Sequence, residues 1–219
     1  MFKKTSQYPR LTVDPVLFVV DENSVKVLLV QRQNAPDKGV WALPGGHSYA
    51  QEQMQDKASQ SLQDKTGYPT DKIRFIDQLY AFDTHTSDPR GHAVTVSFLM
   101  FGPKLEVNET AQYFDVNDIP QLAFEHNVIV DKAIERVRRE LSLTTLIAKL
   151  VPREFTLNQL HGVYESVLNT PLDNRNFRKK FLAFNLTEDT GKKEQGTAHR
   201  PSKLYRFKQR DILPLSNTF

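Results

Sequence analysis

LPGGHSYAQEQMQDKASQSLQDKTGY, residues 43–68, is the stretch that decides how this sequence folds. It opens with a Gly-Gly turn and continues as a polar helix in which Met54, Ala58 and Leu62 recur every four positions. This period places the three apolar side chains on one helix face, which can pack against a sheet. Gly67 ends the helix, as glycine commonly does. A glycine turn that leads into a helix N-terminus offers backbone N–H groups to an anion such as a phosphate.

The spacing of this stretch resembles the Nudix box, G-x5-E-x7-R-E-U-x-E-E-x-G-U, where U is an aliphatic residue, and it does so without a gap. Gly46 and Gly67 take the two glycine positions, Glu52 takes the first glutamate and Leu62 takes the aliphatic position. The departures from the box are Gln60 in place of arginine, Ser61, Asp64 and Lys65 in place of glutamates, and Tyr68 at the end.

These departures remove most of the acid chemistry of the box. Positions 61, 64 and 65 share a helix face. The resemblance implies that carboxylates on this face hold magnesium, which prefers hard oxygen ligands. Here the remnant pair Glu52 and Asp64 would have to attract a cation against the positive charge of Lys65. The sequence therefore predicts no catalytic residues and no metal site, in a Nudix fold that binds a nucleotide-like ligand without hydrolysing it.

Length and composition restrict the class of protein. A chain of 219 residues can hold one large domain or two small ones. A hydrophobic content of 39% and a charged content of 25% are ordinary for a globular protein. No apolar run is long enough to span a membrane, and no signal peptide is recognisable. The chain has no cysteine, which excludes disulfides and thiolate chemistry. We expect a cytoplasmic protein without a membrane partner.

The charge is unevenly distributed along the chain. Residues 143–219 contain 13 Lys and Arg against 7 Asp and Glu, whereas the rest of the chain contains 16 against 19. An acidic front and a basic back predict two domains with different partners, and the basic one favours nucleic acid. We place the domains at residues 1–145 and 146–219.

The front half reads as a mixed α/β (α+β) sandwich. Residues 11–20 and 25–31 are apolar runs that predict a buried strand pair. Residues 73–82 and 92–102 predict two further strands. Apolar residues at helical spacing predict a closing helix over residues 127–142.

The back half reads as a helix-turn-helix. Residues 143–153 form an apolar bridge, and Thr156 begins a T-x-x-Q capping box ahead of a first helix. A second helix is predicted over residues 174–184. Its aromatic residues recur at helical spacing and should face a core: Phe177, Phe181 and Phe184. Its basic residues should point outward and contact the major groove of DNA: Arg175, Arg178 and Lys179.

The tail over residues 187–208 has a glycine-containing basic centre and predicts a hairpin. A helix, a turn, a basic helix and a basic hairpin in this order are typical of a winged helix-turn-helix that binds DNA. The hairpin residues expected at the phosphate backbone are Lys192, Lys193, Arg200 and Lys203. A solvated surface is the alternative explanation of such a charge run.

The whole pattern resembles the Nudix-related transcriptional regulators, a family that controls NAD metabolism genes. The resemblance rests on LTVDPVLF, KVLLVQRQNAPDKGVWALPGG, RGHAVTVSF, LAFEH, NFRKKF and HRPSKLYRF. It implies a homodimeric repressor without a cofactor. Its degenerate Nudix domain would sense ADP-ribose or a related NAD-derived nucleotide and then release double-stranded operator DNA. We expect the ligand to shift the DNA-binding domains through the bridge at residues 143–153.

Five residues near the box are candidates for binding this ligand. The glycines allow close approach of the backbone, and the basic residues flank a strand or a turn; ordinary surface charge is the alternative for each of the basic ones. The candidates are Arg32, Gly45, Gly46, Arg90 and His92.

Two other functions stay open. The chain could be an active Nudix hydrolase, an ADP-ribose pyrophosphatase with an accessory domain, because Glu52 and Asp64 remain. It could also be a regulator of the same type that senses a sugar or sugar phosphate, because residues 83–92 carry no decisive motif. An RNA-binding or scaffolding module is disfavoured, since the basic charge lies on a helix-turn-helix pattern.

Overall fold

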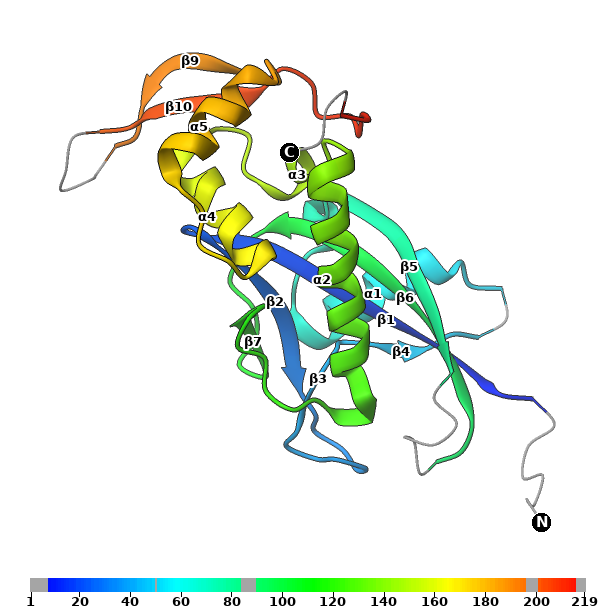
Figure 1. Ribbon diagram of the computed structural model, residues 1–219. Helices are drawn as coiled ribbons and strands as arrows, with labels where there is room; N and C mark the ends of the chain where they lie inside the picture. Colours follow the sequence, from blue (N-terminus) through cyan, green and yellow to red (C-terminus); the bar gives the residue numbers. More distant parts are fainter. Residues whose placement is uncertain (1–7, 50, 84–89, 196–200, 216–219) are drawn as a thin grey trace.

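The computed structural model describes residues 8–49, 51–83, 90–195 and 201–215, which form two sheets (Figure 1). The larger sheet has seven described strands; its central order is β3-β2-β1-β6-β5, while β4 pairs with β1 and β7 pairs with β2. These strands are β1 (Arg10–Asp21), β2 (Ser24–Gln31), β3 (Trp41–Ala42), β4 (Gly46–His47), β5 (Phe75–Asp83), β6 (Ala93–Pro103) and β7 (Ala111–Asp115).

Strands β1 and β6 lie at the centre of this sheet. They run parallel, with a register from Arg10 opposite Ala93 to Val20 opposite Pro103. Both strands are buried along most of their length because both faces of the sheet are covered. The apolar runs predicted as a buried strand pair, residues 11–20 and 25–31, form β1 and β2, which pair antiparallel.

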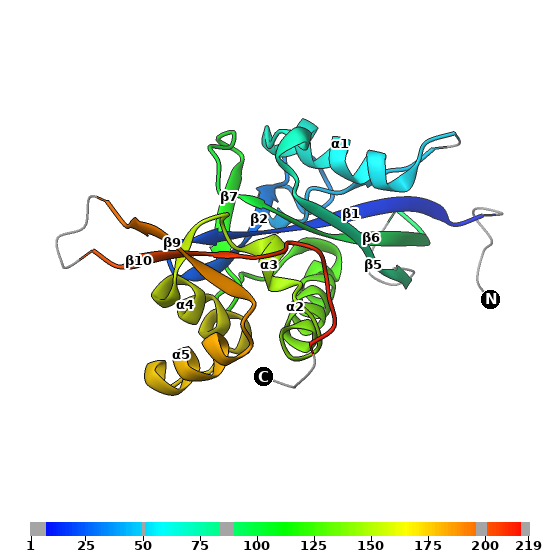
Figure 2. The same cartoon turned by 90° about the horizontal axis from the view of Figure 1, so that it is seen from above.

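Helices cover both faces of the sheet, with α1 (Met54–Thr66) as the only α-helix of the described residues on one side (Figure 2). Helix α1 packs Ala58 and Leu62 on this face, and α2 (His126–Leu143) packs its apolar stripe on the other. Helix α1 ends at Gly67, whose φ of 74° is left-handed, as predicted from the sequence. Two short 3-10 helices, η1 (Thr70–Lys72) and η2 (Ala123–Glu125), follow α1 and precede α2.

The back half is a winged helix-turn-helix. Its described elements are α3 (Ile147–Leu150), β8 (Phe155–Thr156), α4 (Leu157–Leu168), α5 (Asn174–Ala183), β9 (Thr187–Lys193) and β10 (Lys203–Phe207). The three strands pair in the order β8-β10-β9, and the two long ones form the predicted hairpin. Strand β8 was not predicted, since two residues are too few to show a period.

The capping box at the start of α4 forms only in part. Thr156 Oγ1 accepts a hydrogen bond from the Gln159 N–H at 3.0 Å, as predicted. The Gln159 side chain does not return to Thr156. Its Nε2 donates instead to the carbonyl oxygen of Glu22 in the turn between β1 and β2, at 3.0 Å. The residue expected to close a local cap therefore joins the two halves of the chain.

One hydrophobic core runs through both halves. A single cluster of buried side chains contains Phe18 of β1 and Ile134 of α2, and it also contains Phe177 and Phe181 of α5. The bridge at residues 143–153 is part of it, because Ile147, Ala148 and Leu150 are buried. The two halves are thus packed together as well as linked covalently.

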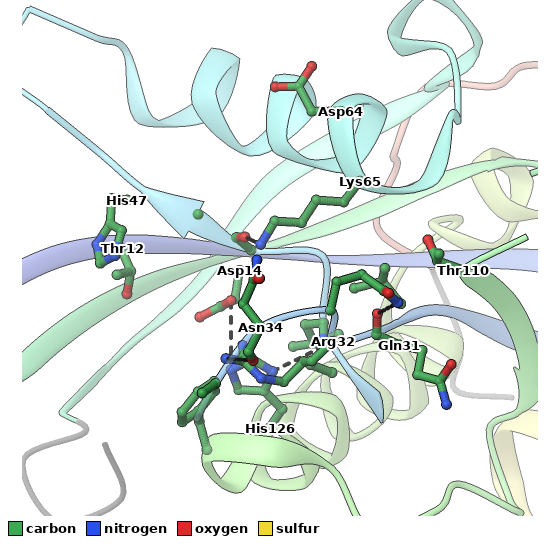
Figure 3. Close-up of a pocket in the computed structure, with 18 of the residues that line it drawn as sticks. Thr12, Asp14, Gln31, Arg32, Asn34, His47, Asp64, Lys65, Thr110 and His126 are labelled. Atoms are coloured by element: carbon green, nitrogen blue, oxygen red, sulfur yellow. Dashed lines mark hydrogen bonds and ion pairs between the residues drawn. The ribbon is translucent and has the colours of Figure 1, made fainter. Parts of the chain in front are cut away.

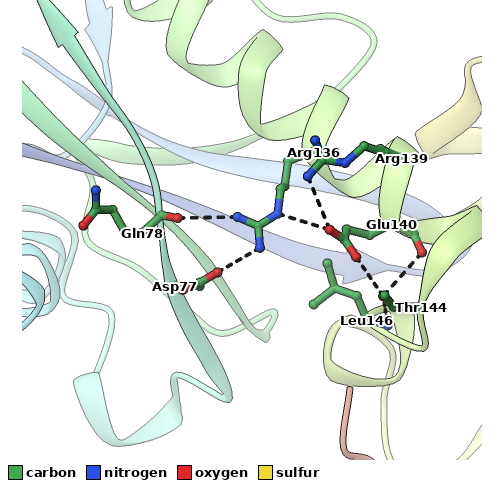
Figure 4. Close-up of polar contacts among 7 residues, drawn as sticks. All are labelled: Asp77, Gln78, Arg136, Arg139, Glu140, Thr144 and Leu146. Carbon is green, nitrogen blue, oxygen red and sulfur yellow. Dashed lines mark hydrogen bonds and ion pairs between the residues drawn. The ribbon is translucent and has the colours of Figure 1, made fainter. Parts of the chain in front are cut away.

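A polar network holds the end of α2 in place (Figure 4). Arg136 pairs with Asp77 of β5 at 2.8 Å and with Glu140 at 3.5 Å, and it donates to the carbonyl oxygen of Gln78 at 3.4 Å. Glu140 in turn accepts a hydrogen bond from Thr144 Oγ1 at 2.9 Å. The sheet edge is thereby tied to the start of the bridge.

The last described segment returns to this bridge. The Thr145 N–H donates to the carbonyl oxygen of Leu213 at 2.9 Å, and the Leu213 N–H donates to Thr145 Oγ1 at 2.9 Å. The Leu215 N–H donates to the carbonyl oxygen of Leu143 at 2.8 Å. The winged half is therefore fastened at both its chain ends.

Candidate functional site

A cavity of about 520 Å³ opens in the front half, between the sheet, the glycine turn, the end of α1 and the loop before α2 (Figure 3). Both polar and apolar groups form its wall. The lining residues used below are Asp14, Arg32, Gly45, Gly46, Asp64, Lys65, Arg90, Phe124 and His126.

Four of the five predicted ligand residues meet at this cavity. Arg32, Gly45, Gly46 and Arg90 line it. His92 is not among the lining residues; it is exposed, and its Nε2 lies 3.0 Å from Asp83 Oδ1. The structure thus gathers residues from the end of β2, the glycine turn and the loop before β6 into one wall.

The two glycines are required by close approach of the protein itself. A Cβ at Gly45 would lie 1.7 Å from Asp14 Oδ1, and a Cβ at Gly46 would lie 2.6 Å from Ser61 Oγ. Each distance is far below a van der Waals contact, so the turn can pack against β1 and α1 only without side chains. Close approach of a ligand, the reason for which the sequence singled out these glycines, stays a prediction.

The prediction that the N-terminus of the helix after the glycine turn borders the anion site is wrong. Helix α1 begins at Met54, several residues after Gly46, and its N-terminal turn does not line the cavity. Asp64 and Lys65, in the last turn of α1, lie there instead. The end of the helix that faces the cavity is the one whose carbonyl groups carry partial negative charge.

Buried polar groups that the sequence analysis did not single out form the floor. Asp14 is 6% exposed and accepts a hydrogen bond from Thr95 Oγ1 at 2.5 Å. His126 Nδ1 accepts the Leu43 N–H at 3.0 Å, so the proton of the neutral ring lies on Nε2, which is 3.8 Å from Asp14 Oδ1. Burial lowers the pKa of His126, against the opposing effect of Asp14. The ring is therefore held neutral beside a carboxylate.

Two guanidinium groups lie over one aromatic ring at the cavity. The Cζ atoms of Arg32 and Arg90 are 4.3 Å and 5.2 Å from the ring centre of Phe124. Arg32 also donates to the carbonyl oxygen of Pro36 at 2.9 Å from Nε and 2.6 Å from Nη2. Phe124 and Glu125 hold successive left-handed conformations, with φ of 55° and 62°, which turn the chain sharply before α2.

Lys65 supplies a third cation. Its side chain extends from α1 toward the strand that carries Asp14, and Nζ donates to the carbonyl oxygen of Gly45 (Figure 3). The side chain is open to the cavity, but the concave walls around its ammonium lower the pKa of Lys65 by desolvation. Asp14 raises this pKa, while Arg32 and Arg90 lower it further.

The donor set does not fit the magnesium ion that Nudix hydrolases use. Asp64 accepts a hydrogen bond from Gln60 Nε2 at 2.6 Å, and its carboxylate points away from Lys65 (Figure 3). Glu52 does not line the cavity; it accepts the Tyr49 N–H at 3.0 Å and pairs with Lys57 at 3.5 Å. No three His, Cys, Asp or Glu side chains among the described residues are grouped as metal ligands. Magnesium requires several hard oxygen ligands in near-octahedral geometry, which this set does not offer.

The predicted basic helix forms as α5 and is capped by Asp173, which accepts the Asn176 N–H at 2.7 Å. Phe177 and Phe181 are buried in the core, whereas Phe184 lies just after the helix and is half-buried.

Two of the three predicted basic residues on α5 are exposed, Arg175 and Lys179. The prediction that Arg178 points outward is wrong. It is half-buried, and its Nη2 donates to Asn158 Oδ1 of α4 at 2.7 Å, so it braces α4 against α5 rather than standing outward.

The hairpin lysines are exposed, and two of them form ion pairs within the domain. Lys192 pairs with Glu154 at 2.8 Å, and Lys203 pairs with Asp189 at 2.8 Å. Lys193 is exposed on β9. Arg200 lies outside the described residues. The molecule thus has an open cavity lined by cations in one half and an exposed basic surface in the other.

Comparison with known families separates the chain in the same way. Residues 10–137 match the NUDIX domain, and residues 147–207 match the NrtR DNA-binding winged helix domain. The chain is 31% identical over 213 residues to the ADPR responsive transcriptional repressor NtrR of Acinetobacter baylyi, covering 93% of this chain and 84% of that protein. The chain belongs to the NrtR family. This confirms the resemblance and the fold predicted from the sequence.

Solved structures of the NrtR family extend the likeness to three dimensions. Shewanella oneidensis NrtR complexed with a 27mer DNA is 29% identical, with a TM-score of 0.78 over 95% of this chain and 99% of that one. The NUDIX domain of the same protein complexed with ADP ribose is 31% identical, with a TM-score of 0.54 over 63% of this chain and 94% of that one.

The front half also has an enzymatic relative. The ADP-ribose pyrophosphatase of Methanocaldococcus jannaschii is 31% identical over 128 residues, which is 56% of this chain and 72% of that protein. Among the described residues of this NrtR-family chain, no helix is both long and apolar enough to cross a membrane.

Proposed function

We propose that the chain is a homodimeric, cytoplasmic repressor that binds operator DNA of NAD metabolism genes through its winged helix. It releases the DNA when ADP-ribose, or a related NAD-derived nucleotide, occupies the cavity of its Nudix domain. The observation that carries this proposal is a cavity with three cations, Arg32, Lys65 and Arg90, in one body with an exposed basic helix.

The cavity suits a nucleotide diphosphate. Cationic side chains balance the charge of the phosphates. The buried carboxylate of Asp14 can accept hydrogen bonds from ribose hydroxyl groups. The A. baylyi relative is described as ADPR responsive, and the S. oneidensis domain was solved with ADP ribose, which supports this ligand.

The DNA-binding role rests on α5 and the hairpin. Arg175 and Lys179 stand on the exposed face of the second helix of a helix-turn-helix, the helix that enters the major groove in this motif. We assign base contacts to these two residues and phosphate contacts to the exposed hairpin lysines Lys192, Lys193 and Lys203. A symmetric dimer would place two such helices on a palindromic site.

Strand β2 provides a route between the two sites. At its start, the Val25 N–H donates to Ser166 Oγ of α4 at 2.9 Å. At its other end, Val30, Gln31 and then Arg32 line the cavity. A ligand that prefers one arrangement of this strand and α4 over another can shift the DNA-binding half. This contact acts together with the bridge at residues 143–153, which was the route expected from the sequence.

The proposal is tested by measuring DNA affinity against ligand. The protein first selects duplexes from a randomised library, and the selected duplex is then titrated in a gel shift with ADP-ribose. We expect saturating ADP-ribose to weaken binding, and AMP at the same concentration to leave it unchanged. Unchanged affinity with ADP-ribose would refute this effector; release by a sugar phosphate instead would favour the sugar-sensing alternative.

The hydrolase alternative is supported by the M. jannaschii relative and by Asp64 at the rim of the cavity. We propose that the chain does not hydrolyse ADP-ribose, because its donor set does not fit magnesium. Incubation with ADP-ribose and MgCl₂, followed by quantification of AMP, separates the two functions. Release of AMP at an enzymatic turnover of about 1 per second or faster would make the chain an enzyme.

A further inference from the structure

The end of α1 that borders the cavity is unfavourable for an anion. Carbonyl groups at a helix C-terminus carry partial negative charge and repel a phosphate. Asp64 adds a carboxylate in the same turn. An anionic ligand in this cavity therefore needs a compensating cation at the end of α1, and Lys65 is the basic residue of that last turn.

The geometry of Lys65 leaves donors for a ligand. Its Nζ donates one hydrogen bond to the carbonyl oxygen of Gly45, which fixes the ammonium between α1 and the glycine turn. An ammonium carries three N–H groups, so two remain for another acceptor. Lys65, Arg32 and Arg90 all line the cavity, which brings three positive charges to its wall.

We propose that the Lys65 ammonium binds the diphosphate of the effector in the role that a metal ion has in Nudix hydrolases, so that binding requires no divalent cation. The inference rests on the proposed function in taking a nucleotide diphosphate as the effector. The lysine that removes the metal site is, on this account, also the residue that replaces the metal's charge.

The electrostatics of the cavity wall agree with this role. Desolvation lowers the pKa of Lys65, and the nearby charges of Arg32 and Arg90 lower it further. The negative charge of a bound diphosphate would oppose both effects, because it stabilises the charged form of the lysine. The charge of Asp14 already acts in the same direction and raises the pKa of Lys65.

Titration calorimetry with ADP-ribose, in EDTA and in MgCl₂, tests the proposal on the full chain. We expect wild-type protein to bind equally in both buffers. Lys65→Met, which keeps the length of the side chain but removes its charge, should weaken binding about 10- to 100-fold, the loss of a charged hydrogen bond. Lys65→Arg should recover most of the affinity. The matched control is Lys72→Met, on an exposed lysine outside the cavity, and should bind as wild type.

Two results would overturn the role of Lys65: wild-type affinity in folded Lys65→Met, or wild-type binding that occurs only with magnesium. Thermal melting establishes that the variant is folded; if it is not, Lys65→Gln takes its place under the same criteria. If ADP-ribose does not bind at all, the proposed effector is wrong. Titration with inorganic pyrophosphate then tests whether Lys65 binds a diphosphate. Pyrophosphate that binds in EDTA and is lost in Lys65→Met supports the inference, whereas no binding to wild type refutes it. Binding that depends on Lys65 without release of DNA would refute only the proposed function.

Discussion

At the scale of single residues, the neutral His126 makes a prediction about pH. Burial lowers its pKa from 6.5, and Arg32 and Lys65 oppose its charged form, while Asp14 favours it. The unfolded chain therefore takes up a proton that the folded chain refuses, so the free energy of unfolding falls as pH drops below about 6.5.

We expect His126→Asn to flatten this pH dependence between about pH 6.5 and 5, because asparagine does not titrate and can still accept the Leu43 N–H. One histidine contributes at most about 1.4 kcal/mol per pH unit. Urea denaturation at a series of pH values measures it. Identical slopes for wild type and variant would show that His126 is not the group responsible.

The site residues show how far side-chain type alone can lead. Arg32 and Arg90 were candidates because each is a cation that flanks a strand or a turn, and both line the cavity. Asp14 could also have been predicted, because it is a charged residue inside an apolar strand and such a charge needs a buried partner. His126 left none, because its partners lie on β1 and the glycine turn, which only folding brings beside it.

At the scale of elements, the contact of α4 with the turn between β1 and β2 depends on Gly162. A Cβ there would lie 2.5 Å from the carbonyl oxygen of Asn23 and 2.6 Å from its Cβ. At an open helix position, Gly→Ala stabilises by about 1 kcal/mol. Here overpacking should reverse the sign, and Gly162→Ala should destabilise by about 1–3 kcal/mol in urea denaturation.

The same variant tests the route between the sites. We expect Gly162→Ala to bind ADP-ribose as wild type does and to release DNA less on binding it, because α4 no longer follows β2. Ser166→Ala removes the acceptor of the Val25 N–H without adding volume and should act in the same direction. If ADP-ribose released DNA from both variants as it does from wild type, the bridge at residues 143–153 would be the only remaining route between the sites.

Helix α5 makes a prediction that separates two kinds of DNA contact. Arg175→Ala should weaken DNA binding by about 1–3 kcal/mol and relax sequence preference if Arg175 contacts a base.

A hairpin lysine that contacts a phosphate should, when replaced, reduce the slope of log affinity against log salt by about 0.9. Lys193→Ala is the test of this and Lys72→Ala the control of equal charge change, both measured by gel shift across a salt series. An unchanged slope for Lys193→Ala would remove the hairpin from the DNA interface.

Most helices and strands could be predicted from the sequence, and the predictions that were wrong have a common cause. Long periodic segments such as α2 and β6 were predicted within a few residues of their ends. The wrong predictions concern side chains that bond to other elements. Gln159 donates to Glu22 instead of closing its own helix cap, and Arg178 donates to Asn158 instead of facing outward. A helical wheel shows which side of a helix is polar, but it does not show which neighbour will accept a hydrogen bond there.

At the scale of the whole molecule, the shared core predicts a single unfolding transition. Phe177 and Phe181 belong to the same buried cluster as Phe18, so the winged half has no separate core, although the front half has a second cluster on the α1 face of its sheet. We expect calorimetry to show one peak, and ADP-ribose at 100 times its Kd to stabilise the entire fold by about 2.7 kcal/mol. Two peaks, of which only one moves with ligand, would show that the halves unfold independently.

Thr145 and Leu213 give the winged half an unusual mechanical property. Their mutual hydrogen bonds close residues 145–213 into a loop whose two ends meet at one point beside the end of α2. The winged half also touches the front half through α4, whose Gln159 and Ser166 form hydrogen bonds with Glu22 and Val25. A rotation of this half about Thr145 therefore has to shift those contacts as well, so the wing can move only as far as they allow.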